Sequence, residues 1–257
     1  MTKTHNKSML QKIRLFQAWV LFLHNIFRPH YDSVFNPPLF ISKKVLFDAK
    51  YFKHFPNQLF TAMNTLNSTE QFVTPAACLH VYPELKGKDV KKYAAFGMAH
   101  CARYENGNWQ SPYRLPDFHM VELVIIGNEK EIIEKIKRIE DLVKTTLTDF
   151  GFNGEFKNAT DAFFLGQDEG AKMIQQLKGL KQEFIVHDGK RKIALASINN
   201  HEDFFGKRFD IKNGKTFSNS LCVAFGIERL TAYSLKVWGG DQKTWPKKFK
   251  KYAKMLQ

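Results

Sequence analysis

The stretch most informative about the fold is CARYENGNWQSPYRLPDFHMVELV, residues 101–124. Strand-like patterns of apolar residues run over residues 93–103 and again over 118–126, which predicts two strands. The segment between them, residues 105–117, contains asparagine, glycine, serine and two prolines, and such a composition is typical of a loop. The stretch therefore predicts an antiparallel pair of strands joined by a long connection.

Three side chains of this stretch suit a nucleotide. At a period of two residues, Arg103 and Glu105 are expected on one face of the first strand, and Phe118 begins the opposing strand. An arginine forks onto phosphate, a carboxylate can read the edge of adenine, and an aromatic ring can stack on the base. Strands commonly alternate charged and apolar residues, so this pattern alone leaves a nucleotide site and an ordinary sheet face both open.

A second stretch, CVAFGIERL at residues 222–230, predicts a strand that feeds a helix. The strand is expected over residues 220–225, and Gly226 leads from it into a helix over residues 227–238. Arg229 lies in the first turn of that helix. Because the first turn carries unpaired N–H groups, such a junction can bind phosphate.

Two further helices are predicted from apolar residues spaced three and four apart. The first covers roughly residues 8–30 and ends near Pro29, because the residue before a proline avoids the helical region. The second begins after Asn128, whose side chain can cap it together with Glu131, and ends at Gly151.

The remaining elements complete an α+β pattern. Strands are predicted over residues 183–187 and 192–199, and the tail KKFKKYAKMLQ, residues 247–257, is expected to be a basic helix on the solvated surface. Strand-rich stretches with helices between them and an antiparallel pair at the centre favour α+β over a doubly wound fold.

The composition bounds the class of protein. A chain of 257 residues with 44% hydrophobic residues can form one large globular domain. The 39 basic and 25 acidic residues give a net charge of +14, which suits a polyanionic partner but also fits a merely soluble basic surface.

Cysteine usage and hydropathy favour a cytoplasmic protein. The three cysteines form no C-x-x-C pair, which fits a reducing compartment and leaves metal binding or burial open. The apolar run at residues 15–27 contains Gln17 and is too short to span a bilayer, and no small-residue cleavage site follows it. It is expected to be a buried or interfacial helix, and no membrane partner is expected.

The two quoted stretches resemble a known family. The arginine-x-glutamate strand with its long loop and returning aromatic is similar to motif 2 of class II aminoacyl-tRNA synthetases, and the strand-glycine-x-glutamate-arginine helix is similar to their motif 3. The two occur in the family's order, about 120 residues apart. Within that class the chain most resembles the seryl branch, and within the branch the amino acid:[carrier protein] ligases. The resemblance covers residues 46–240 and includes the stretches KYFKHFPNQL (50–59), TPAACLHVYP (74–83) and SINNHEDFFG (197–206).

The resemblance implies the fold. It predicts a class II synthetase catalytic domain, a central antiparallel sheet flanked by helices, over residues 46–257, preceded by an N-terminal helical extension over residues 1–45. Motif 1, the helix and strand through which these enzymes dimerise, is not readable, and the N-terminal helix is a candidate to replace it. A homodimer is expected.

The resemblance also implies a zinc site. In the similar ligases a cysteine, a glutamate and a second cysteine bind zinc, and the matching positions are Cys78, Glu122 and Cys222. Three protein ligands leave one tetrahedral position open, which would take the amino group of the substrate amino acid beside Glu122. Cys101 matches no ligand and is expected to be buried.

The ATP site follows in the same way. Arg103 would hold the α-phosphate, Glu105 would read the adenine amino group, and Phe118 and Arg229 would sandwich the base; the two arginines are the catalytic candidates. Because Ala194 stands where the synthetases usually carry a metal-binding glutamate, Glu183 becomes the candidate for ATP-bound Mg²⁺. Further matched positions in the ATP site are Arg114, Leu115, Ala196, Ser197, Ile198 and Asn199.

Three functions remain open at this stage. The first is activation of a small amino acid, glycine or alanine, to an aminoacyl-adenylate and its transfer to the phosphopantetheine thiol of an acidic carrier protein. The sequence shows no long charged coiled-coil arm for gripping tRNA, which favours this function. The second is a tRNA-charging or tRNA-interacting paralogue of seryl-tRNA synthetase, and the third is an inactive interaction module.

Overall fold

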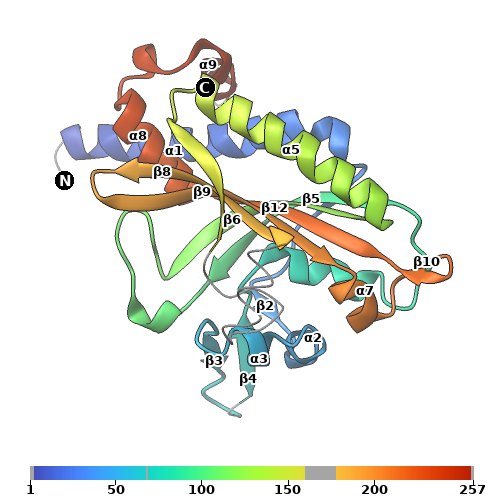
Figure 1. Ribbon diagram of the computed structural model, residues 1–257. Coiled ribbons are helices and arrows are strands. Elements are labelled where there is room, and N and C mark those ends of the chain that lie inside the picture. The colour runs from blue at the N-terminus through green and yellow to red at the C-terminus, as the bar shows by residue number, and fades with distance from the viewer. Residues whose placement is uncertain (1–2, 68, 160–177, 256–257) are drawn as a thin grey trace.

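A seven-stranded sheet organises the chain, for which a computed structural model describes residues 3–67, 69–159 and 178–255 (Figure 1). The neighbouring strands are antiparallel except for β1, which pairs in parallel with β5 at one edge. In spatial order the strands are β1 (Ser33–Phe35), β5 (Tyr93–Ala102), β6 (Asp117–Gly127), β12 (Asn219–Gly226), β9 (Arg191–Glu202), β8 (Lys181–Asp188) and β7 (Gly154–Asn158).

The period of two along the strands divides the sheet into two buried faces. On β6, Val121, Leu123 and Ile125 belong to the larger core, whereas Val124 and Ile126 belong to a second core on the other face. Because both faces of the sheet are covered, the sequence of β6 is a nearly continuous run of apolar residues. Glu122 is the exception on the second face and is only 2% exposed.

Four helices form the outer layer over the larger core. They are α1 (Lys3–Phe27), α5 (Glu129–Asp149), α8 (Ile227–Trp238) and α9 (Lys247–Lys254). Trp19 of α1 is fully buried between them; its ring stacks on Trp238 (5.8 Å between centroids) and its Nε1 donates to Ser234 Oγ at 2.9 Å. The Trp19 ring also lies 4.8 Å from that of Phe249 in α9, so aromatic residues of three helices pack the two ends of the chain together.

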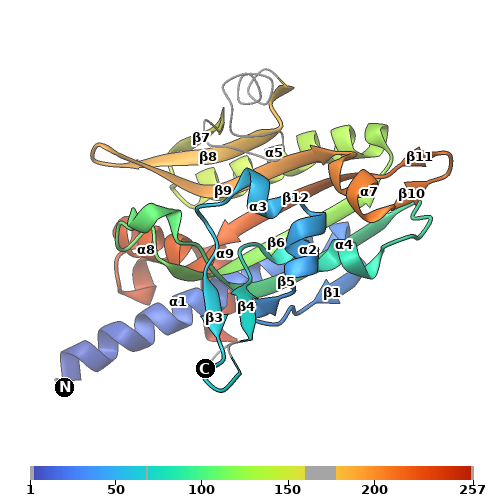
Figure 2. The same ribbon diagram turned by 90° about the horizontal axis from the view of Figure 1, so that it is seen from below.

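Short elements cover the opposite face, as Figure 2 shows from below. They are η2 (Ala77–His80), α4 (Val81–Glu84), α2 (Lys43–Asp48), α3 (Tyr51–His54) and α7 (Phe204–Phe209), with a small sheet of β2 (Phe40–Ile41), β4 (Glu70–Val73) and β3 (Thr61–Met63). The remaining short elements are η1 (Arg28–His30), η3 (Glu105–Gly107), η4 (Gln242–Thr244), β10 (Lys212–Asn213) and β11 (Thr216–Phe217).

Most sequence-based elements are confirmed. The central antiparallel pair is β5 with β6, and the helix after Asn128 is α5, which begins with the expected capping box to Glu131. The strand into a helix through Gly226 is β12 followed by α8. Among the described residues, no helix is long and apolar enough to cross a membrane. The division at residues 45 and 46 stays a prediction.

Two expectations were wrong. Strand β5 ends at Ala102, and Glu105 lies in a 3-10 turn with a φ of 47°, so Arg103 and Glu105 do not share a strand face. The tail is not simply a solvated helix, because Phe249 and Tyr252 of α9 are buried in the larger core. Apolar residues three apart in the tail were the signal for that packing.

Candidate active site

A cavity of about 1,140 Å³, counted with its open mouth, lies on the sheet face that carries Glu122. The β5–β6 loop, the start of α8, strands β8 and β9, and the η2 and α3 segments all contribute to its walls. Ile198 is the one predicted site residue that does not line the cavity, and its side chain lies in the larger core. The predicted residues that line the cavity are Cys78, Arg103, Glu105, Arg114, Leu115, Phe118, Glu122, Glu183, Ala196, Ser197, Asn199, Cys222 and Arg229.

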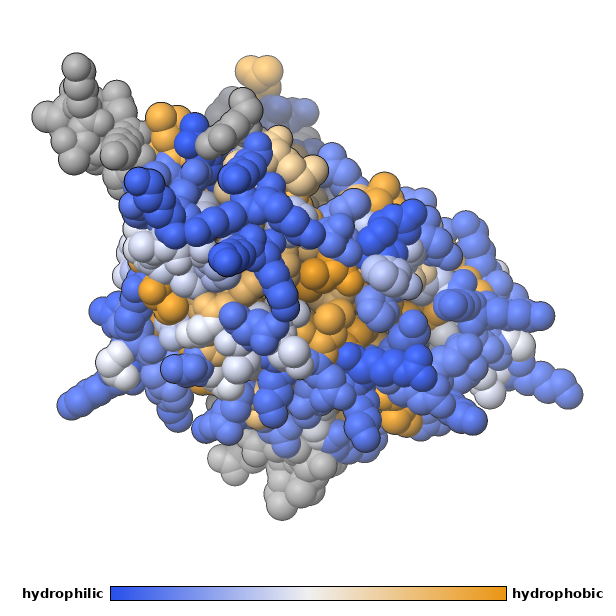
Figure 3. Space-filling view, turned by 90° about the horizontal axis from the view of Figure 1, so that it is seen from above, coloured by the Kyte–Doolittle hydropathy of each residue, from blue (hydrophilic) through white to orange (hydrophobic). Residues whose placement is uncertain are grey.

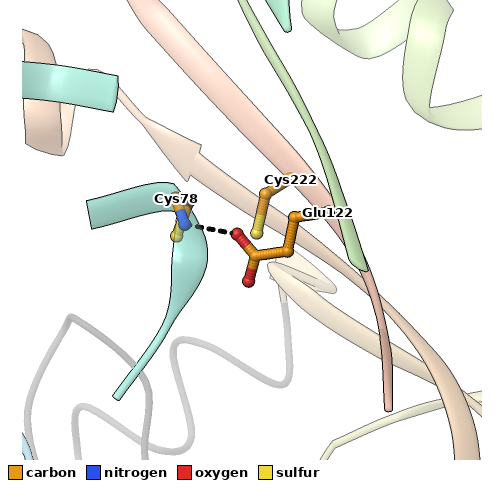
Figure 4. A group of neighbouring side chains, drawn as sticks. All are labelled: Cys78, Glu122 and Cys222. Carbon is orange, nitrogen blue, oxygen red and sulfur yellow. Dashed lines mark hydrogen bonds between the residues drawn. The ribbon is translucent and has the colours of Figure 1, made fainter. Parts of the chain in front are cut away.

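The three predicted metal ligands meet at the buried end of the cavity (Figure 4). One ligand atom from each of Cys78, Glu122 and Cys222 lies within 4.8 Å of the other two, and all three residues are buried. Cys222 pairs with Val124 across β12 and β6, so Glu122 is its diagonal neighbour on the same sheet face. Cys78 approaches from η2, and its backbone N–H donates to Glu122 Oε2 at 2.6 Å.

The electrostatics of this cluster favour a cation. Burial raises the pKa of Glu122 to about 7, although the Cys78 hydrogen bonds and the nearby Arg103 charge oppose the rise. The hydrogen bond with Cys222, together with burial, raises the pKa of the Cys78 thiol well above its usual value. Their anionic forms are therefore costly without a metal ion, and a divalent cation would compensate them.

The donor set fits zinc. Two thiolates and a carboxylate are ligands that Zn²⁺ accepts, and three protein ligands are the number found in zinc sites that keep a position open for substrate. Among the described residues, this is the one group of three or more His, Cys, Asp and Glu side chains that could hold a metal. Cys101 is fully buried in a separate small core beside Met120, as expected for a residue that is not a ligand.

His201 is a site residue that sequence reasoning missed. It lies on β9, and its Nε2 is 3.8 Å from Cys222 Sγ, while its Nδ1 is 3.2 Å from the Tyr82 hydroxyl and 3.3 Å from Ser220 Oγ. Burial lowers its pKa to about 3, so the ring is neutral. The period of two that places Ser197 and Asn199 in the cavity extends to His201, and this was the available signal.

Arg103 is held in place by the backbone. Its Nε donates to the Pro75 carbonyl at 2.8 Å, and its guanidinium lies over the Phe118 ring, 5.7 Å from the centroid. This aromatic contact and the fixed Nε orient the guanidinium within the cavity. The arrangement suits an anion such as the α-phosphate of a nucleotide.

Arg229 is also anchored through backbone carbonyls. Its Nε donates to Tyr113 at 2.7 Å and one Nη donates to Ala194 at 2.8 Å, so the loop after β5 and strand β9 both hold it. Ala194 has no side-chain carboxylate, and its backbone carbonyl is what accepts the hydrogen bond from Arg229.

The carboxylates expected at the nucleotide have basic partners. Glu105 pairs with Arg114 Nε at 3.2 Å, and Glu183 pairs with Lys181 at 3.2 Å. Lys181 lines the cavity beside Glu183 and had no role in the sequence-based interpretation.

Comparison with known proteins places this arrangement in a family. The model of the tRNA synthetase class II core domain (G, H, P, S and T) matches residues 63–237, which is more than half of the chain. The chain belongs to this family.

Among curated proteins the chain is similar to carrier-protein ligases and to a serine--tRNA ligase. Amino acid--[acyl-carrier-protein] ligase 1 of Bradyrhizobium diazoefficiens is 29% identical over 191 residues, which are 72% of this chain and 58% of that protein. A type-2 serine--tRNA ligase of Methanothrix thermoacetophila is 24% identical over 63% of this chain and 33% of its own length. The chain spans just over half the length of the two carrier-protein ligases that it matches.

Solved structures confirm the fold. The M. kandleri SerRS in complex with A. aeolicus tRNASec superposes with a TM-score of 0.82 at 16% identity, over 96% of this chain and 56% of that one. The seryl-tRNA synthetase of Pyrococcus horikoshii complexed with ATP gives 0.72 at 14% identity, over 95% and 56%. The α+β class II catalytic fold is therefore confirmed.

Proposed function

We propose that this chain uses ATP to activate a small amino acid, glycine or alanine, and transfers it to the phosphopantetheine thiol of an acidic carrier protein. The observation that carries the proposal is the cysteine–glutamate–cysteine cluster at the buried end of the cavity that also holds Arg103 and Arg229. The relatives named as amino acid carrier-protein ligases support this acceptor.

The cluster would bind the substrate amine. Cys78, Glu122 and Cys222 would hold Zn²⁺, and the bound ion would supply a Lewis-acid site that accepts a neutral α-amine and selects against molecules without one. Tyr51, Phe55 and Met120 also line the cavity, and their bulk would favour a small substrate side chain.

The arginines would serve the adenylation step. The amino-acid carboxylate attacks the α-phosphorus, a new O–P bond forms, and the bond to the departing pyrophosphate breaks. Arg103 stabilises the charge that develops on the α-phosphate, and its backbone anchor fixes it beforehand. Arg229 and Phe118 would enclose the base, Glu105 would read its amino group, and Glu183 would position the Mg²⁺ that accompanies ATP.

The transfer step requires only a thiol at the mouth of the cavity. The phosphopantetheine thiol gives up its proton to solvent, its sulfur attacks the carbonyl carbon of the adenylate, and AMP leaves with the bonding pair of the broken C–O bond. We do not expect tRNA to be the acceptor.

The activity test is pyrophosphate exchange with each amino acid, followed by transfer to a phosphopantetheinylated carrier and to tRNA. We expect exchange with glycine or alanine and labelling of the carrier. If no amino acid supports exchange, the chain is an inactive interaction module. If tRNA is labelled and the carrier is not, the chain is a tRNA-charging enzyme.

The zinc test is metal analysis of three single variants. We expect Cys78→Ala and Cys222→Ala to lose zinc. Cys101→Ala is the matched control, because Cys101 is equally buried yet lies outside the cluster, and it should retain zinc. Full zinc content in the first two variants would refute the site.

A homodimer through α1 and β1 is also proposed. Motif 1 is a helix followed by a strand, and although it was not readable in the sequence, the structure has a long helix, α1, followed by the edge strand β1. Val34 on β1 is 72% exposed and so available to a partner subunit. Light scattering should show a dimer for the wild-type protein and a larger monomer fraction for Val34→Asp. A monomeric wild-type protein would rule out the dimer.

A further inference from the structure

The positive charge of the chain is concentrated in two segments. Residues 1–31 and 242–257 contain 11 of the 39 lysines and arginines and none of the 25 aspartates and glutamates. The rest of the chain, with 28 basic and 25 acidic residues, is nearly balanced. The two segments hold helices α1 and α9, which pack against each other in the outer layer.

The packing of α9 directs its lysines outward. Phe249 and Tyr252 are buried against Phe22 of α1, at 5.8 Å and 5.4 Å between ring centroids. The exposed residues between 247 and 254 are lysines, and the turn before the helix adds Lys243. We call this surface the α9 face: Lys243, Lys247, Lys248, Lys250, Lys251 and Lys254.

The α9 face is poorly neutralised. Within the described residues, one of its six lysines forms an ion pair, Lys248 with Asp149 at 3.1 Å. Lysines on other surfaces have close carboxylates, for example Lys44 and Lys86 on Asp48 and Lys207 on Asp203. A polyanion could therefore exchange its counterions for these lysines, releasing the counterions into solution, without competition from neighbouring acidic groups.

We propose that the α9 face binds the phosphate backbone of a nucleic acid without reading its sequence. Lys247, Lys251 and Lys254 recur at steps of four and three residues, so their charges repeat every ~4.5–6 Å along the helix. Lysine ammonium groups contact phosphates as point charges and fix position rather than sequence.

The chemistry of the face disfavours other polyanions. A protein partner needs apolar or aromatic anchors at the centre of its interface, and the aromatic residues of α9 face inward. An interfacial membrane helix inserts an apolar side, but that side of α9 is covered by α1. Figure 3 looks onto the outer layer, where hydrophilic side chains cover much of the surface and apolar ones show between them.

The α9 face lies on the other side of the sheet from the cavity. Phe249 and Tyr252 belong to the core over the outer face, whereas Cys78 and Cys222 belong to the core on the cavity side. A nucleic acid held there is thus not placed as an acceptor for the activated amino acid. The proposal is independent of the ligase function and can hold or fail without it.

The test measures binding of fluorescent tRNA transcript and of fluorescent duplex DNA over a range of salt concentrations. In the wild type, the logarithm of the association constant should fall linearly with the logarithm of salt concentration. In Lys247→Gln/Lys251→Gln/Lys254→Gln the slope should shrink by about two to three, roughly 0.7–0.9 per lost contact, with similar losses for both nucleic acids.

A matched control removes the same charge from another surface. Lys88→Gln/Lys91→Gln/Lys92→Gln changes three exposed lysines in the connection before β5, beside Asp89, and should keep the wild-type slope. Equal losses in both triple variants, or no salt-dependent binding by the wild type, would overturn the proposal. So would tighter binding to anionic lipid vesicles or to polyglutamate than to either nucleic acid. Thermal melts of all three proteins verify that each is folded.

Discussion

Replacing Glu122 by glutamine should make the metal-free protein more stable above neutral pH. The pKa of Glu122 is raised by burial from 4.5 to about 7 in the folded chain. A folded pKa above the unfolded one means that the folded state holds its proton more tightly. The contribution of this group is therefore fully present below pH 4.5 and is lost as the pH rises through 7. A shift of that size corresponds to on the order of 3 kcal/mol, an upper bound for a buried group that can relax. Glutamine is neutral throughout and keeps an acceptor for the Cys78 N–H.

The assay is urea unfolding of chelator-treated wild type and Glu122→Gln between pH 5 and pH 8. The difference between the two free energies of unfolding isolates Glu122, because every other titrating group contributes to both proteins. We expect a small difference at pH 5 that grows in favour of the variant until about pH 7.5. Zinc at 100 times its dissociation constant should stabilise the wild type by ~2.7 kcal/mol and leave the variant unchanged. Parallel pH curves, or a less stable variant at pH 8, would refute the account of Glu122 as a costly buried acid.

Three further changes test the site and the fold. His201→Phe removes the ring nitrogen beside Cys222, so it should weaken zinc binding about 10–100-fold in competition with a chromogenic chelator; unchanged affinity would assign His201 to packing alone. Arg103→Lys keeps the positive charge but loses the two parallel N–H donors of the guanidinium, so it should slow pyrophosphate exchange ~100-fold or more while zinc content stays at the wild-type level. A smaller loss of exchange would show that Arg103 does not bind the α-phosphate. Gly97→Ala would place a Cβ 2.3 Å from the Phe35 carbonyl oxygen, and should lower the free energy of unfolding by ~1–3 kcal/mol in urea; wild-type stability would show that β1 can shift freely.

The elements that sequence predicted well are those with local causes. The stripe and capping box of α5 and the strand, Gly226 and helix of motif 3 are determined by residues within one or two turns of each other. The left-handed conformation of Glu105 had no such signal, because that residue type rarely adopts a positive φ. The sequence therefore located the loop correctly but extended β5 too far.

The metal cluster could not be derived from spacing. Cys78, Glu122 and Cys222 are 44 and 100 residues apart, and their meeting depends on the antiparallel register of β6 and β12 and on the return of η2 beneath them. Resemblance to a family supplied these positions, and the structure brings them together. For His201, the alternation along β9 indicated a shared face with Asn199, but its proximity to Cys222 follows from the register of β9 against β12, which pairs Cys222 with Asn199.

The cost of the cluster argues against an inactive interaction module. A buried carboxyl with a pKa near 7 destabilises the folded chain around and above neutral pH unless something binds it. An apolar residue of similar volume at Glu122 would pack on β6 without that penalty. The φ of 47° at Glu105 adds backbone strain at the other end of the same cavity. Both costs occur at one cavity and fit the ligands proposed for it, a cation at the cluster and a nucleotide at the arginines, whereas a purely structural role leaves them unexplained.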